Sequence, residues 1–131
     1  MANLNCIVVT PESTALEAEA DFIALPLYDG EIGIAPGHSP MIGRLGFGEM
    51  RLRSGSGTKS YYVDGGFVQV ADDTISVLTS RAIPADKVNA AAAKEQLAAA
   101  LKRPANTPEL LDIRERLIAQ ARAQERVAKK A

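Results

Sequence analysis

The segment Leu25–Ile42, LPLYDGEIGIAPGHSPMI, collects glycines, prolines and the only histidine of the chain, His38, in a pattern that could do chemistry. A phosphate-binding loop needs its glycines followed by a lysine and a hydroxyl residue at a helix start, or a G-x-G-x-x-G turn between a strand and a helix. DGEIGIAPGH has neither the lysine nor a following helix. We therefore interpret the segment as a set of turns that docks against another surface.

Catalysis by His38 with its neighbour Ser39 is not expected. Adjacent side chains in an extended chain point to opposite faces, whereas a nucleophile needs its base within hydrogen-bonding reach. One histidine and one cysteine, Cys6, are too few ligands for a zinc or iron site. Asp72 and Asp73 are typical of a hairpin turn. The sequence predicts no enzyme, no metal site and no bound cofactor.

The 131 residues allow one main domain and a small accessory unit. No run is apolar and long enough to span a bilayer, and the start MANLNC has no basic leader before an apolar run, so we expect a cytosolic chain with Cys6 buried on a strand. Ten acidic residues face five basic ones up to Ile83, and ten basic residues face six acidic ones after it. This asymmetry indicates an acidic partner for the tail. Nucleic acid is not expected, because no aromatic residue follows Phe67 to stack on a base.

Up to Ile83, short runs of alternating apolar and polar residues, such as EMRLRSG and FVQVADDTISVLTS, predict half-buried strands. Turn-forming residues separate them at Ser54–Gly57, at Asp64–Gly66 and at Ala71–Asp73. We expect each of these three turns to join antiparallel neighbours. Many brief strands with tight turns indicate a sandwich or a flattened barrel.

After Pro84 the glycines stop, and the alanine-rich stretch predicts a helix from about Asp86, its N-cap, to Lys102. A second helix is expected after Thr107 as N-cap and Pro108 as the first helical residue. Its apolar residues recur on one face, at Leu110, Ile113, Leu117 and Ala121. The predicted division is residues 1–84 and 85–131. Each buried alanine methyl contributes only ~0.8 kcal/mol before ordering costs, so we expect the helices to dock weakly.

Four segments, in this order before an alanine-rich tail, closely resemble the epsilon subunit of bacterial F-type ATP synthase: VVTPES, DGEIGIAPGHSPMI, YYVDGGFVQV and ISVLTSRAI. The resemblance covers nearly the whole chain. It implies a mainly β chain with additional α structure, in which an N-terminal ten-stranded antiparallel β-sandwich precedes a C-terminal antiparallel two-helix hairpin. It also implies a non-catalytic subunit of the central rotor, which couples proton-driven rotation to ATP synthesis.

The resemblance further implies partners and a location. The sandwich would bind the gamma subunit and the c-ring, with Glu31 and His38 at the family's c-ring positions, so the docking residues we expect are Glu31, Gly33, Pro36, Gly37 and His38. The helices would swing out toward the alpha and beta subunits and restrain ATP hydrolysis, with an acidic segment of beta meeting Arg114, Arg116, Arg122 and Arg126. The chain would lie on the cytoplasmic face of the cell membrane, peripheral to it.

Some members of this family bind ATP in the folded hairpin through I/L-D-x-x-R-A. The matching run here, ADKVNA, retains Asp86 but has Asn89 in place of the arginine, which removes a charge-assisted phosphate contact of about 1.5–3 kcal/mol. These two residues are thus a degenerate version of that site, and we expect no ATP binding. The alternative functions are a stand-alone nucleotide-responsive sensor and a free β-sandwich adaptor that grips an unrelated acidic protein.

Overall fold

The computed structural model describes residues 3–12, 14–55 and 57–130. In these ranges the chain forms eight strands, a short 3-10 helix and two α-helices. In chain order they are β1 (Leu4–Val9), β2 (Thr14–Ala20), β3 (Phe22–Leu27), β4 (Gly30–Ile34), β5 (Met41–Ser54), β6 (Gly57–Ala71), β7 (Thr74–Leu78), β8 (Ala82–Pro84), the 3-10 helix η1 (Ala85–Lys87), α1 (Ala90–Leu101) and α2 (Pro108–Lys130).

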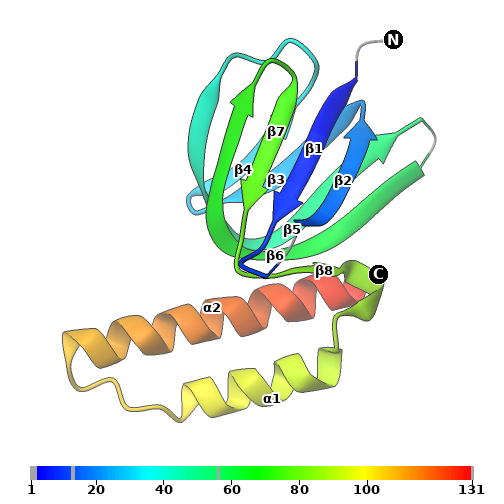
Figure 1. Cartoon of the computed structure of the whole chain (residues 1–131). Coiled ribbons are helices and arrows are strands. Elements are labelled where there is room, and N and C mark those ends of the chain that lie inside the picture. The colour runs from blue at the N-terminus through cyan, green and yellow to red at the C-terminus, as the bar shows by residue number, and fades with distance from the viewer. Residues whose placement is uncertain (1–2, 13, 56, 131) are drawn as a thin grey trace.

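The strands form a sheet in the order β2-β1-β7-β6-β5-β3-β4, with β8 beside β6. This sheet folds over into two layers because the long strands β5 and β6 curve from one layer into the other (Figure 1). Inward-facing residues of both layers fill one core, which includes Cys6, as expected from the sequence. The predicted β-sandwich is therefore confirmed, although one described pair, β1 with β7, runs parallel.

The prediction of a turn at Asp64–Gly66 is wrong. These residues lie inside β6, which stays paired with β5 in one register on both sides of them, from Met41↔Val70 to Ser54↔Gly57. Gly65 and Gly66 have φ angles of +71° and +108°, which bend the strand without ending it. Because β5 and β6 each continue through the bend, the described residues contain eight strands where ten were expected.

The other two turns lie where the sequence predicts them. β5 and β6 form a hairpin closed by the pair Ser54↔Gly57, although Ser56 within this turn is outside the described residues. Asp72 and Asp73 join β6 to β7 with φ angles of +50° and +58°. Aspartate tolerates this left-handed conformation better than most residues, which explains its use in a two-residue turn.

The first helix begins later than predicted. Pro84 is followed by η1, and Val88 then returns to an extended conformation, so Asp86 does not cap the helix. Asn89 is the N-cap of α1 instead, because its side chain accepts a hydrogen bond of 3.0 Å from the Ala92 amide. The second helix begins as predicted, since Thr107 Oγ1 accepts a 3.1 Å hydrogen bond from Leu110 N.

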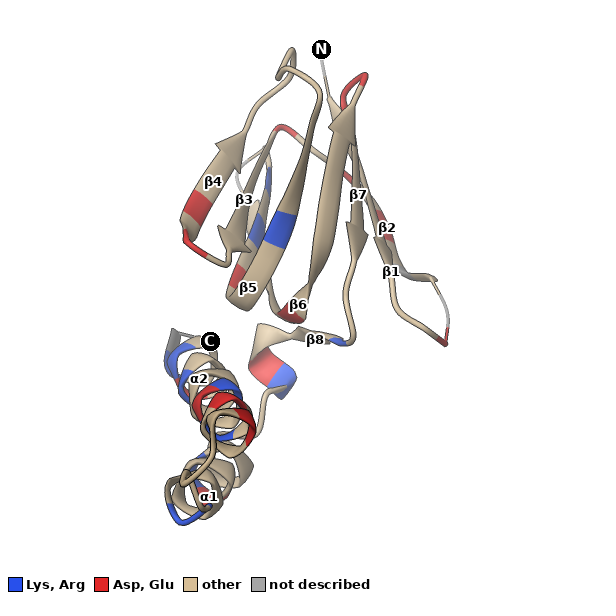
Figure 2. Cartoon of the chain, turned by 90° about the vertical axis from the view of Figure 1, so that its left-hand side faces the viewer, with Lys and Arg blue, Asp and Glu red and all other residues tan. Residues whose placement is uncertain are grey.

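The two helices form an antiparallel hairpin below the sandwich, and α2 lies between the sandwich and α1 (Figures 1 and 2). The predicted hairpin is thereby confirmed. A second, separate apolar cluster joins α2 to the sandwich through Tyr62, Ala85, Ala123 and Val127. The contributions of α2 to it are one alanine and one valine. The helix that meets the sandwich is thus α2, and the alanine-rich α1 packs against α2. Among the described residues, no helix is both long enough and apolar enough to cross a membrane.

Candidate functional site

The segment Leu25–Ile42 forms the end of β3, all of β4 and the loop that follows. β4 is an edge strand, since it ends the strand order and pairs only with β3 within the described sheet. Gly33 leaves room for the ring of Phe22, because an added Cβ would lie 2.7 Å from the ring atom Cζ. A turn-rich edge strand of this kind can dock against another surface.

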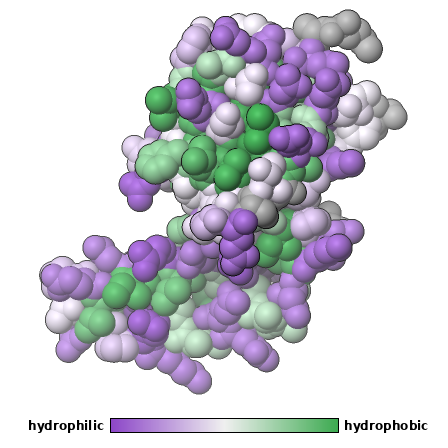
Figure 3. Space-filling model, in the orientation of Figure 1, coloured by the Kyte–Doolittle hydropathy of each residue, from purple (hydrophilic) through white to green (hydrophobic). Residues whose placement is uncertain are grey.

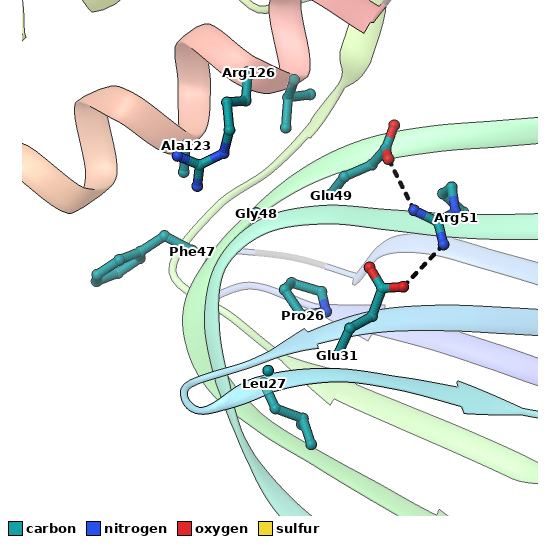
Figure 4. Close-up of a pocket in the computed structure, with 11 residues that line it drawn as sticks. Pro26, Leu27, Glu31, Phe47, Gly48, Glu49, Arg51, Ala123 and Arg126 are labelled. Carbon is teal, nitrogen blue, oxygen red and sulfur yellow. Dashed lines mark hydrogen bonds and ion pairs between the residues drawn. The ribbon is translucent and has the colours of Figure 1, made fainter.

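Glu31 lies near the start of β4 and belongs to a small charged cluster formed by β4 and β5, which flank β3. Arg51 donates to Glu31 at 3.1 Å and to Glu49 at 3.2 Å, as Figure 4 shows. The hydrogen bond to Glu49, followed by that to Glu31, raises the pKa of the Arg51 guanidinium. Glu31 nevertheless stays exposed, so one edge of its carboxylate remains available to a partner.

His38 lies beyond the other end of β4, so the strand separates it from Glu31. Its Nδ1 is 2.8 Å from the Ser39 carbonyl oxygen, which fits a loop residue rather than a catalytic base. The preceding Gly37 has a φ of +86° and donates its amide to Asp73 Oδ1 at 2.7 Å. With Pro36 this contact fixes the loop against the β6–β7 turn, and less entropy is then lost when the loop docks.

The four arginines expected to meet an acidic partner are spread along α2. Arg114 is held within the hairpin, because it donates to the Leu101 carbonyl oxygen at 3.4 Å and pairs with Glu115 at 3.7 Å. Arg116, Arg122 and Arg126 are exposed. Arg122 and Arg126 line a groove of about 500 Å³ between α2 and the sandwich. Two of the four arginines therefore face the sandwich of the same chain when the hairpin is docked.

The two residues of the degenerate nucleotide motif belong to different elements. Asp86 lies in η1 and is exposed, whereas Asn89 caps α1 with its side-chain oxygen. The extended residue Val88 lies between them. Asn89 therefore has a local structural role in place of the missing arginine.

Comparisons with known proteins agree with this fold. The family model for the beta-sandwich domain of the ATP synthase delta/epsilon chain matches residues 3–85. The ATP synthase epsilon chain of Rhodopirellula baltica is 50% identical over 127 residues, which cover 97% of this chain and 99% of the relative. That of Leptospira borgpetersenii is 36% identical over 95 residues, or 72% of this chain and 75% of the relative. The chain belongs to the ATP synthase epsilon-chain family.

As an epsilon chain, it is a non-catalytic subunit of the central stalk of an F-type ATP synthase, whose F1 part is a peripheral membrane-associated complex. Solved structures agree with the fold. A chain of the Euglena gracilis mitochondrial ATP synthase OSCP/F1/c-ring structure has a TM-score of 0.85 at 18% identity, with 96% of this chain and 81% of that chain covered. A chain of the Tetrahymena thermophila mitochondrial central stalk and c-ring structure has a TM-score of 0.75 at 16% identity, with 95% and 96% covered.

The epsilon chain also carries an exposed apolar patch that the sequence analysis missed. Phe67 pairs across strands with Leu78 on one side and with Arg44 on the other. Tyr28 stacks against Arg44, whose guanidinium carbon is 5.5 Å from the ring centroid. With Ile42 on the same strand face as Arg44, these residues define the outer patch: Tyr28, Ile42, Phe67 and Leu78, each 51–75% exposed. Figure 3 shows apolar surface over this side of the sandwich.

A polar cluster around Asp64 was missed as well, because the sequence assigns this residue to a turn. The Asp64 carboxyl is buried, and it accepts hydrogen bonds from Tyr62, Arg81 and Gln120. Burial, followed by the charge of Asp64, raises the pKa of the Tyr62 hydroxyl well above its ordinary value, so this hydroxyl remains a donor. The signal in the sequence was an aspartate within an otherwise apolar strand pattern.

Proposed function

We propose that residues 1–84 of this epsilon chain anchor it to the gamma subunit and the c-ring, and that residues 85–131 regulate ATP hydrolysis. Through the anchor, rotation of the c-ring is coupled to ATP synthesis. The observation that carries this proposal is the full-length match to an epsilon chain at 50% identity, which includes the docking segment and both helices. In this reading the chain lies on the cytoplasmic face of the membrane, and the gamma and c subunits hold it there.

The outer patch is the surface best suited to gamma. A cluster of exposed apolar side chains on a sheet face is typical of a protein interface, and a rotor subunit needs a permanent interface. Phe67 and Leu78 are 57% and 51% exposed, so burying the rest of both side chains should stabilise the complex by about 2–3 kcal/mol. The variant Phe67→Ser/Leu78→Ser should therefore bind gamma about 30- to 150-fold more weakly.

Binding of the purified chain to gamma, measured by calorimetry, tests this assignment. Leu111→Ser is the matched control, since Leu111 is an exposed leucine on α2, away from the outer patch. Equal affinity of the sandwich variant and the control would assign gamma to another surface.

The edge strand β4 and its loop are the surface proposed for the c-ring. Glu31, Gly33, Pro36, Gly37 and His38 all lie on this free edge or on the loop that continues it. The variant Glu31→Ala/His38→Ala should reduce co-purification with the c-ring and ATP-driven proton pumping. Glu17→Ala/Glu19→Ala on the opposite edge strand, β2, is the control, since it also replaces two polar side chains. Unchanged pumping in the first variant would refute this assignment.

The hairpin is proposed to restrain hydrolysis once it leaves the sandwich. Its exposed arginines Arg116, Arg122 and Arg126, joined by Arg114, would then meet an acidic segment of the beta subunit. Deletion of the residues after Arg103 should raise the ATP hydrolysis rate of the assembled enzyme. If hydrolysis and its activation by detergent stay the same, regulation by this tail is refuted.

ATP binding by the hairpin is not expected. Asn89 serves as a helix cap and Asp86 lies on η1, so neither residue favours a nucleotide site. Calorimetric titration of the purified chain with ATP tests this expectation, and heat released on binding would contradict it.

A further inference from the structure

The Asp64 carboxyl joins three segments of the chain at one buried point. It is 7% exposed, and its Oδ1 accepts hydrogen bonds from Tyr62 Oη and from Gln120 Nε2, both at 2.9 Å. Its Oδ2 accepts from Arg81 Nε at 3.2 Å. Tyr62 lies on the same strand, Arg81 on the connection between β7 and β8, and Gln120 on α2. The carboxyl is thus bonded both to the sandwich and to the hairpin.

Two of the three donors belong to the sandwich side. Thr79 strengthens that side, since its hydroxyl accepts from the Asp64 amide at 3.0 Å and donates to the Arg81 carbonyl at 3.2 Å. If α2 moved away, Asp64 would lose Gln120 but keep Arg81 and Tyr62. The buried carboxyl would therefore never be left without partners, which is the condition that makes an isolated buried charge so unfavourable.

The apolar contact around this point is small on the hairpin side. Ala123 and Val127 are the residues of α2 in the cluster with Tyr62. Small side chains remove little apolar surface from water. The hydrogen bond from Gln120 to the charged Asp64, together with the contact of the buried Gln124 with the Tyr62 hydroxyl, is accordingly a large part of what holds α2 in place.

We propose that the hydrogen bond from Gln120 to Asp64 is a latch that holds the hairpin against the sandwich. Opening the latch loses the bond from Gln120 to Asp64 and the contact of Gln124 with the Tyr62 hydroxyl, while Arg81 and Tyr62 keep the carboxyl satisfied. The hairpin can therefore leave and return without unfolding the sandwich. Only the physiological role of the latch rests on the proposed regulation of ATP hydrolysis. The latch itself is a property of the isolated chain.

The test measures how often the hairpin leaves the sandwich in the full chain. Val127 is 2% exposed in the interface, so the thiol of Val127→Cys can be labelled only after α2 undocks. Cys6→Ala removes the native thiol from this background. Gln120→Ala should then increase the labelling rate about ten- to hundredfold. Gln96→Ala, an exposed glutamine of α1, is the control for the same change in helix propensity.

Gln120→Met separates the hydrogen bond from mere packing. Methionine has about the length and volume of glutamine but cannot donate to Asp64, so Gln120→Met should label about as fast as Gln120→Ala. If Gln120 only fills space, Gln120→Met should label like the unaltered background. That result, or equal rates for Gln120→Ala and Gln96→Ala, would overturn the latch.

The same variants in the assembled enzyme test whether the latch affects ATP hydrolysis. A released hairpin should restrain ATP hydrolysis more strongly, so Gln120→Ala should lower the hydrolysis rate and Gln96→Ala should not. Faster labelling with unchanged hydrolysis would establish the latch and refute the proposed regulation. Unchanged labelling would refute the latch and leave the regulation to be judged by deletion of the tail.

Discussion

Gly66 gives the sharpest test of the fold, because two separate effects forbid a side chain there. Its φ of +108° lies in a region that residues with a Cβ rarely adopt. In addition, an added Cβ would lie 2.8 Å from the Leu78 carbonyl carbon and 3.0 Å from Thr79 Cα, with the Leu78 oxygen nearer still. All three neighbours are backbone atoms, so no side-chain rotation can make room. Gly66→Ala must therefore move β7 or straighten β6.

The magnitude follows from these two effects. The unfavourable φ costs about 1–2 kcal/mol. Phe67↔Leu78 is the end pair of the β6–β7 ladder, and moving this end loses backbone hydrogen bonds at ~1 kcal/mol each as well as packing at the core. We expect Gly66→Ala to lower the free energy of unfolding by about 3–5 kcal/mol, a large share of the stability of a chain of this size.

Urea denaturation of the purified chain, followed by circular dichroism, measures this change. Gly55→Ala is the matched control: its φ is +59°, but an added Cβ would meet no atom within 4 Å. It should therefore show only the conformational cost of about 1–2 kcal/mol. If the two variants lose equal stability, the close approach of β6 and β7 at Gly66 does not determine the bend, and the reasoning fails.

Two further predictions concern a buried thiol and the docking loop. Burial raises the pKa of the Cys6 thiol from 9.0 to about 12, so the folded state keeps a proton that the unfolded state has lost. The stability that the protonated thiol contributes is complete below pH 9. From there to about pH 12 the free energy of unfolding should fall by about 1.4 kcal/mol per pH unit, a slope that urea titrations of Cys6→Ala should lack. Asp73→Gly keeps the turn but removes the acceptor of the Gly37 amide, so hydrogen exchange at Gly37 should be about tenfold faster than in Asp72→Gly; equal exchange would contradict the role of Asp73.

The parts of the fold that depend on residues close together in the chain, such as helix starts and tight turns, could be predicted from the sequence. Thr107 and Pro108 specify the start of α2 through an N-cap and a fixed φ, and both act where the sequence places them. The Asp72–Asp73 turn is equally local. At Asp86 the same reasoning failed, because Val88 stays extended, which leaves Asn89 as the residue next to the helical run.

Features that depend on distant contacts could not be predicted. The pattern Asp64–Gly66 is typical of a turn, and only the neighbouring backbone of Leu78 explains why glycine is needed inside a continuous strand. The docking residues on β4 came from a family resemblance, since one sequence cannot tell which edge of a sheet is free. The outer patch was hidden for a related reason: alternation places Phe67 outward, but not beside Leu78 and Arg44.

The two apolar clusters of this chain have no residue in common. The inner cluster draws its buried members entirely from strands, and the helices close neither end of it. The sandwich thus carries its whole interior within the first two thirds of the chain. A tail of different length or composition could therefore follow the sandwich without changing the residues of its core. Under the proposed function, attachment and the restraint of hydrolysis could then evolve separately.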